Sequence, residues 1–63
     1  MDFTVTNLNL TDGGCELSWE SHGAAGKITL FAGHYMVDNG EKFVGSAQNM
    51  EEAIWLADAS AQA

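Results

Sequence analysis

The stretch from Gly45 to Ala63, GSAQNMEEAIWLADASAQA, is the one segment of this 63-residue chain that has a helical pattern. Asn49 stands just before that pattern and Glu52 follows three positions later, which is the arrangement of an N-terminal capping box. At 100° per residue one face of the helix is apolar, which predicts a helix that lies on a sheet. The residues of that face are Met50, Ala53, Ile54, Leu56 and Ala57.

The opposite face of this helix is expected to carry a large aromatic ring among carboxylates. Trp55 comes one turn after Glu51 and one turn before Asp58, and residues at this spacing are neighbours on a helix surface. An indole in such a place either folds back over an exposed sheet edge or is presented to a partner as an anchor, because Trp is enriched at interface hot spots.

The first third of the chain predicts a β-hairpin. Residues 3–6 alternate apolar and polar side chains, as a half-buried strand does. The alternation then changes parity, which predicts a bulge or bend near Asn7. Residues 12–14, Asp-Gly-Gly, predict a turn. Residues 15–21 follow with the clearest alternation in the sequence, which predicts a strand with a dry side and an acidic side.

The middle of the chain predicts further antiparallel strands. Residues 22–26 are small and flexible and predict the loop of a second hairpin. Gly33 then interrupts a β pattern that begins at Lys27, so either a bulge re-aims one strand or a separate strand covers residues 34–37. We expect one long, kinked strand. The Asn39-Gly40 pair is a strong hairpin signal and predicts a return strand over residues 41–44.

These elements predict an α+β fold: a four-stranded antiparallel meander with one C-terminal helix packed on one face, within a single domain of residues 1–63. A chain of this size buries only about 60% of the surface that it exposes when unfolded. Cys15 is the sole cysteine, so an internal disulfide is excluded and apolar packing must hold the fold.

The charge balance is the most informative number in the composition. Nine acidic residues face two lysines and no arginine, which gives a net charge of −7. Such a chain repels nucleic acid and anionic membranes and favours a basic protein partner. The sequence has no apolar run of membrane-spanning length, so we expect a cytoplasmic protein.

Enzyme chemistry has little support in the sequence. Cys15, His22 and His34 are the soft or titratable ligand types, and none of them stands at a ligand-like separation from another. A nucleophilic cysteine needs a nearby base and an electropositive setting, which a strongly acidic chain does not favour. We therefore expect no enzyme activity, no metal and no cofactor. A small hydrolase that uses Cys15 or a carboxylate pair would need a pocket that joins a base to that group.

The carboxylates themselves are the candidate site. Glu16 and Glu20 fall on one face of their strand, about 13 to 14 Å apart at ~3.4 Å per residue. A regular array of carboxylates can approximate the phosphates of a DNA strand and occupy a basic DNA-binding groove. The competing interpretation is that the acidity only supports solubility or reflects a salt-rich habitat. We expect six residues to bind a partner: Glu16, Glu20, Glu51, Glu52, Trp55 and Asp58.

In its size, its acidity and its β-rich build with one helix, the whole chain resembles the small acidic anti-CRISPR proteins of phages, some of which look like DNA in charge. A second likeness lies at the end of the chain, where residues 40–46 and 50–53 are similar to the strand-into-helix ending of small sheet-plus-helix domains in phage and integrase proteins. Several of those domains bind DNA, but the basic residues that DNA binding needs are missing here.

The resemblance implies an inhibitor of phage origin that acts in the host cytoplasm and blocks a CRISPR effector complex. Together with the charge it leads to our main expectation, a non-enzymatic acidic DNA mimic that occupies the basic nucleic-acid-binding surface of a partner without binding nucleic acid or membrane. The alternative is a small accessory protein-protein interaction module, for example a homodimer formed through a sheet edge, whose charge is incidental.

Overall fold

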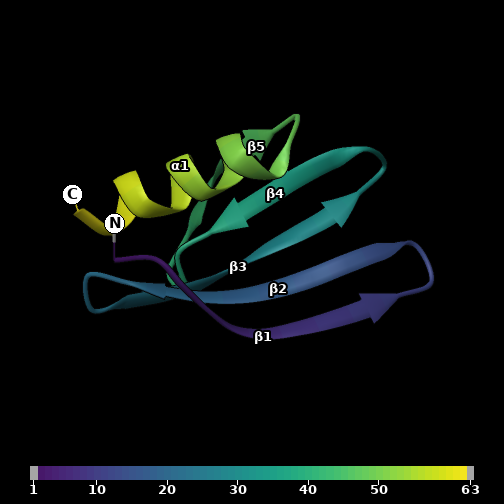
Figure 1. Ribbon diagram of the computed structural model, residues 1–63. Coiled ribbons are helices and arrows are strands. Elements are labelled where there is room, and N and C mark those ends of the chain that lie inside the picture. The colour runs from purple at the N-terminus through teal and green to yellow at the C-terminus, as the bar shows by residue number, and fades with distance from the viewer. Residues whose placement is uncertain (1, 63) are drawn as a thin grey trace.

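The computed structural model describes residues 2–62 and consists of one antiparallel sheet and one helix (Figure 1). The strands follow one another in chain order across the sheet, so the topology is a simple meander. The α+β class and the C-terminal helix are confirmed. The elements are β1 (Thr4–Thr11), β2 (Gly14–Ser21), β3 (Ala24–Phe31), β4 (His34–Asp38), β5 (Phe43–Ala47) and α1 (Met50–Gln62).

The sheet has five strands, so the prediction of four strands with one long, kinked strand across Gly33 is wrong. The chain turns back at Ala32 and Gly33, and Phe31 pairs directly with His34. Both turn residues have positive φ, 53° and 80°, which suits a two-residue turn whose twist matches that of the flanking strands. Alanine rarely adopts such a φ, and this is why the pair is a weak turn signal in the sequence.

The predicted bulge in the first strand is confirmed. The pairing of β1 with β2 shifts register between Val5 and Asn7, so Thr6 is the extra residue. The shift lets Val5 and Leu8 pair with Trp19 and Leu17, two buried residues of the same face of β2. The parity change in the sequence was therefore the signature of a real structural feature.

The core lies between α1 and one face of the sheet. Its buried residues are Leu17, Trp19, Ile28, Val37, Ala47, Ala53 and Ala57. Two alanines on the inner side of α1 let the helix backbone approach the sheet closely, while Met50, Ile54 and Leu56 pack around them. The predicted apolar face of the helix is therefore confirmed. The helix packs on β2 to β5 and not on β1 within the described residues.

The last hairpin differs from the prediction in its boundaries. The return strand covers Phe43–Ala47 rather than residues 41–44, because a four-residue loop separates it from β4. Asn39 organises this loop: its side-chain oxygen accepts hydrogen bonds from the backbone N–H groups of Glu41 and Lys42, each at 3.1 Å. The helix then begins at Met50, and no helix within residues 2–62 is both long and apolar enough to cross a membrane.

Candidate functional site

The outer surface of α1 near its first turn presents two carboxylates and an indole to solvent. The Asn49 side chain caps the helix by accepting a hydrogen bond from the Glu52 backbone N–H at 2.8 Å, which is the first half of the predicted capping box. Glu51 and Glu52 are exposed, and their negative charge is favourable at the positive end of the helix dipole. Trp55 is 66% exposed, which is unusual for so large an apolar side chain.

These four residues, Asn49, Glu51, Glu52 and Trp55, line one shallow hollow of about 390 Å³, and we call them the helix patch. No lysine, arginine or histidine occurs in α1, so the carboxylates of the patch have no cation on their own helix. The patch therefore combines an exposed aromatic face with uncompensated negative charge. A cationic side chain fits such a surface, because its apolar stem can lie on the indole while its head reaches a carboxylate.

Asp58 does not belong to this surface, and its predicted exposure beside Trp55 is wrong. Asp58 is buried, and its carboxylate accepts a hydrogen bond from the Ser21 hydroxyl at 2.6 Å and another from the Gln62 amide at 2.7 Å. His22 Nε2 lies 3.4 Å from the same carboxylate. Asp58 thus fastens the second half of α1 to the turn between β2 and β3, and it is a structural residue.

The group of Ser21, His22 and Asp58 contains the residue types of a hydrolase triad but not its arrangement. Both the serine hydroxyl and the imidazole are directed to the carboxylate, whereas a catalytic serine donates its proton to the histidine. Ser21 is also 2% exposed, so a substrate has no access to its oxygen. The arrangement is suited to holding the helix on the sheet.

The Asp58 network makes stability depend on pH in acid. The hydrogen bond from Ser21 lowers the pKa of Asp58, with further contributions from Gln62 and from the nearby His22, against the opposing effect of burial. A lowered pKa means that the stabilisation is complete above the ordinary Asp value of about 4 and is lost as pH falls through the folded-state value. We expect Asp58→Asn to be less stable than the parent protein at pH 7, with a difference that shrinks below about pH 4.

Urea unfolding of both proteins at pH 7, 5, 3.5 and 2.5 measures this difference. The Glu41→Gln variant is the control, because Glu41 is exposed in a loop and its variant is expected to follow the parent protein at every pH. A constant gap between Asp58→Asn and the parent across the series would contradict the assignment.

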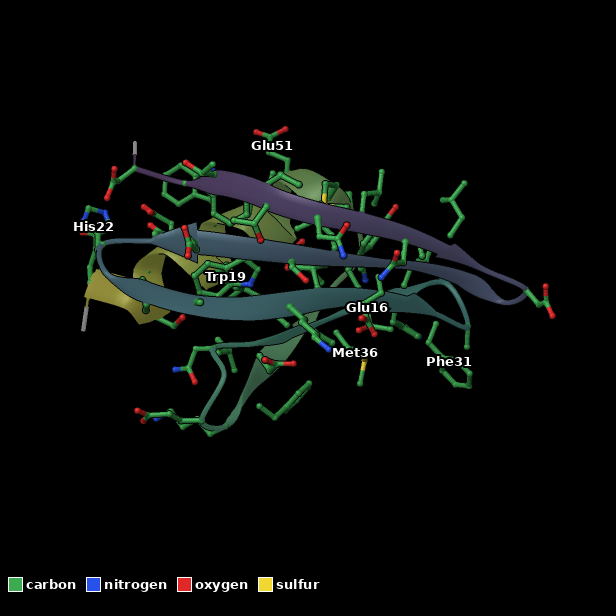
Figure 2. The ribbon with its side chains drawn as sticks, turned by 90° about the horizontal axis from the view of Figure 1, so that it is seen from below. Glu16, Trp19, His22, Phe31, Met36 and Glu51 are labelled. Atoms are coloured by element: carbon green, nitrogen blue, oxygen red, sulfur yellow. The ribbon has the colours of Figure 1, made fainter. Side chains whose placement is uncertain are left out.

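Glu16 and Glu20 lie on the opposite side of the sheet from the helix patch. Figure 2 looks onto the sheet face that turns away from α1, with Glu16 in front and the helix behind the strands. Glu16 forms an ion pair with Lys27 at 3.3 Å, so part of its charge is compensated, while Glu20 is exposed. Both carboxylates share one face as predicted, but the six expected residues do not form one continuous array.

This open sheet face is mixed in character. Thr29 pairs with both Glu16 and Met36, so the three side chains share this face, with Thr29 between the other two. Phe31 is 67% exposed at the end of β3, where Figure 2 places it at the right-hand rim. A broader hollow of about 490 Å³ also opens along the sheet, lined by Thr6, Ser18, Trp19, Glu20, Ala25, Gly26, Lys27, Asp38 and Gly40. Lys27 lies among its acidic residues, so this face is less negative than the alternation of β2 suggested.

The residues considered for catalysis are kept apart by the sheet. Cys15 lies near the start of β2 and His22 directly follows its last residue, which places them about 24 Å apart at ~3.4 Å per residue. Cys15 shares the helix-facing side of the sheet with Leu17, whereas His34 pairs with Phe31 on the open side. Residues 2–62 also contain no cluster of three or more His, Cys, Asp or Glu that could hold a metal ion.

Reasoning from the sequence missed the role of Ser21 and His22, which were expected to be ordinary strand and loop residues. Only the fold brings the end of β2 and the following turn beside the second half of α1, and nothing in the sequence spacing indicates that these two residues contact Asp58.

Comparison of the chain with protein family models, with curated proteins and with solved structures finds no match.

Proposed function

We propose that this protein is a non-enzymatic inhibitor that acts as an acidic DNA mimic. It places the helix patch on the basic nucleic-acid-binding surface of a partner protein in the host cytoplasm and thereby excludes nucleic acid from that surface. One observation carries the proposal: Trp55 is 66% exposed beside two carboxylates on a helix that has no cation. An exposed tryptophan within a charged patch is typical of an interface anchor.

The chemistry of the patch favours arginine and lysine as the groups that it binds. The face of an indole attracts a cation by about 0.5 to 2 kcal/mol, and a flanking carboxylate adds a charge-assisted hydrogen bond. A basic DNA-binding groove offers several such side chains, which are held apart to contact successive phosphates. The net charge of −7 then speeds the encounter with such a groove over a longer range.

The resemblance to acidic anti-CRISPR proteins makes a CRISPR effector complex the first partner to test. The site proposed here is smaller than the six residues expected from the sequence. Asp58 is committed to the fold, and Glu16 and Glu20 face away from the helix patch. We therefore propose that Glu51, Glu52 and Trp55 make the contact.

A competition experiment tests the function. Purified CRISPR effector complexes are loaded with a fluorescent target duplex, and the loss of bound DNA is followed by anisotropy as the full chain is added at 50 to 300 mM NaCl. We expect the protein to displace DNA, with an apparent affinity that falls as salt rises. Trp55→Ala should weaken the competition by about 30-fold, which corresponds to a hot-spot residue of ~2 kcal/mol.

Charge variants locate the effect on the molecule. Glu51→Gln with Glu52→Gln should slow association and flatten its salt dependence. Asp12→Asn with Glu41→Gln removes the same amount of charge from two exposed loop positions outside the helix patch, and this pair should change association little. Glu16→Gln with Glu20→Gln should likewise change association only by the small amount that follows from the lower net charge. No displacement from any effector, or equal effects of the three pairs, would argue against the helix patch as an inhibitory site.

A further inference from the structure

The outer edge of β1 is the least protected part of the molecule. β1 is the first strand of the meander, and α1 packs on the other four strands (Figure 1). Three aliphatic side chains on the helix-facing side of β1 are therefore uncovered: Val5 is 50%, Leu8 56% and Leu10 82% exposed. Edge strands usually carry a charge, a proline or a bulge that prevents pairing with another chain. Here the bulge at Thr6 protects only the first part of the strand.

The backbone around Asn9 is free to pair with another strand. Only Asp12 and Gly13 separate Thr11 from Gly14, so these two residues form the hydrogen-bonded pair that closes the β1–β2 hairpin. Hydrogen-bonded pairs alternate along an antiparallel ladder, and Asn9 is therefore bonded to β2 as well. It follows that the backbone N–H and C=O groups of Leu8 and Leu10 point away from β2, to the open edge.

The distribution of charge indicates which kind of strand can pair with the β1 edge. The chain carries a net charge of −7, yet residues 3–11 contain no ionisable side chain. A basic protein would find no carboxylate to pair with on this strand, whereas pairing with β1 of a second copy sets no like charges opposite each other along the two strands. We propose that the protein forms a homodimer by antiparallel pairing of β1 with β1 of a second copy. This inference does not rest on the proposed function.

One register satisfies both the backbone and the side chains. If Asn9 lies opposite Asn9 of the second copy, Leu8 lies opposite Leu10 on each side of the two-fold axis. The two Leu8–Leu10 pairs are then hydrogen-bonded pairs, which matches the outward direction of their backbone groups, and their side chains meet on the helix-facing side. The interface is the same patch on both copies, so it closes at a dimer.

The dimer extends the sheet and places both helices on the same side of it. A two-fold axis between antiparallel strands runs perpendicular to the sheet, so each face of one copy continues into the same face of the other. The six aliphatic side chains of the two β1 strands then form an apolar strip that runs between the two helices. In Figure 2, Glu51 projects past the β1 edge. In the dimer, Glu51 of each copy therefore points toward the two-fold axis.

The direction of the salt dependence distinguishes dimerisation from the binding of a basic partner. The contact consists of one strand edge and is smaller than the ~800 Å² per partner of a standard interface, so we expect dissociation constants in the micromolar range or weaker. Two copies with a charge of −7 each repel one another, so added salt should strengthen the dimer. Competition for a basic surface should instead weaken as salt rises.

Sedimentation equilibrium of the full chain between 10 and 500 µM, in 50 and 500 mM NaCl, is the first test. We expect a monomer–dimer equilibrium that shifts at least several-fold toward dimer in high salt, and we expect Leu10→Lys to abolish it. Phe31→Lys is the matched control, because it introduces the same charge at another exposed apolar position, away from β1, and should leave the dimer intact. Circular dichroism checks that both variants fold, which their exposure predicts.

A cross-link tests the register. In a Cys15→Ala background, Asn9→Cys should form an intermolecular disulfide on mild oxidation, since Cα atoms in a non-hydrogen-bonded pair lie about 4.5 Å apart, within the disulfide range. Asn7→Cys exposes a thiol on the same strand, but its counterpart in the second copy is about four residues out of register, at roughly 13 Å. It should cross-link far more slowly.

Three results would overturn the proposal: a monomer at every concentration and salt, a dimer that survives Leu10→Lys but not Phe31→Lys, or equal cross-linking of the two cysteine variants. Assemblies that grow beyond the dimer would also overturn it, because they indicate pairing of β1 with β5. None of these outcomes bears on DNA competition by the helix patch, so the two proposals can fail separately.

Discussion

Trp19→Ala is expected to lower the free energy of unfolding by about 3 to 5 kcal/mol, the cost of truncating a fully buried large aromatic residue. Trp19 is 0% exposed and its ring stacks with Phe3 at a centroid distance of 5.7 Å. A domain of this length is stabilised by only about 3 to 9 kcal/mol in total. Much of the variant protein should therefore be unfolded at 37 °C, and urea denaturation followed by circular dichroism measures the loss.

Two matched variants separate packing from the loss of a tryptophan as such. Trp55→Ala makes the same truncation at a position that is 66% exposed, and it should change stability by no more than about 0.5 kcal/mol. Trp19→Phe should lose far less than Trp19→Ala, because a ring still fills the site and the indole Nε1, which has no hydrogen-bond partner in the fold, is removed. Similar losses for Trp19→Ala and Trp55→Ala would contradict the burial assigned to the two side chains.

The difference between Trp19 and Trp55 was readable from the sequence because each lies in a long periodic segment. The alternation of β2 placed Trp19 with Leu17 on the dry side, and the helical period placed Trp55 away from the apolar face of α1. The same reasoning located the bulge in β1, because a change of parity has few other causes. The local sequence pattern was sufficient to predict burial wherever the periodicity of a single strand or helix determines which side chains face the core.

Asp58 shows where local pattern was not sufficient. At 100° per residue it lies about 60° nearer the apolar face of α1 than Trp55 does, at the border between the two faces. Its environment was decided by Ser21 at the end of β2 and by His22 in the turn that follows, 37 and 36 positions earlier in the chain. Such a position can be exposed or buried, and only the packing of helix on sheet selects between them.

The number of strands was missed for a related reason. The turns at residues 12–13, 22–23 and 32–33 each end in glycine, so Gly13, Gly23 and Gly33 recur every ten residues, with eight-residue strands before each turn. That spacing is a signal for regular hairpins that the identity of Ala32 alone does not give. The acidic array failed for a different reason: α1 covers the dry side of β2, so the outer surface of the helix and the acidic side of β2 lie on opposite sides of the molecule.

Gly26→Ala is expected to have the second large effect, because no space exists for even one added methyl group. A Cβ at this position would lie 2.1 Å from the carbonyl oxygen of Asp38 and 2.7 Å from the Cα atom of Asn39. Both are backbone atoms, which cannot move aside without separating β3 from the end of β4. We expect a loss of about 3 kcal/mol or more, at or above the upper end of ordinary overpacking.

Gly13→Ala is the control for this substitution. A Cβ at Gly13 would have no atom within 4 Å, and Gly13 is not among the glycines with positive φ, so the variant should match or slightly exceed the parent protein in stability. Equal and small effects of the two variants in urea denaturation would show that the backbone at Asp38 and Asn39 does not lie against Gly26 of β3. A loss of stability in Gly26→Ala alone would instead establish that contact. The contact packs β3 against the start of the β4–β5 connection, and β5 and the helix that carries the helix patch follow that connection in the chain.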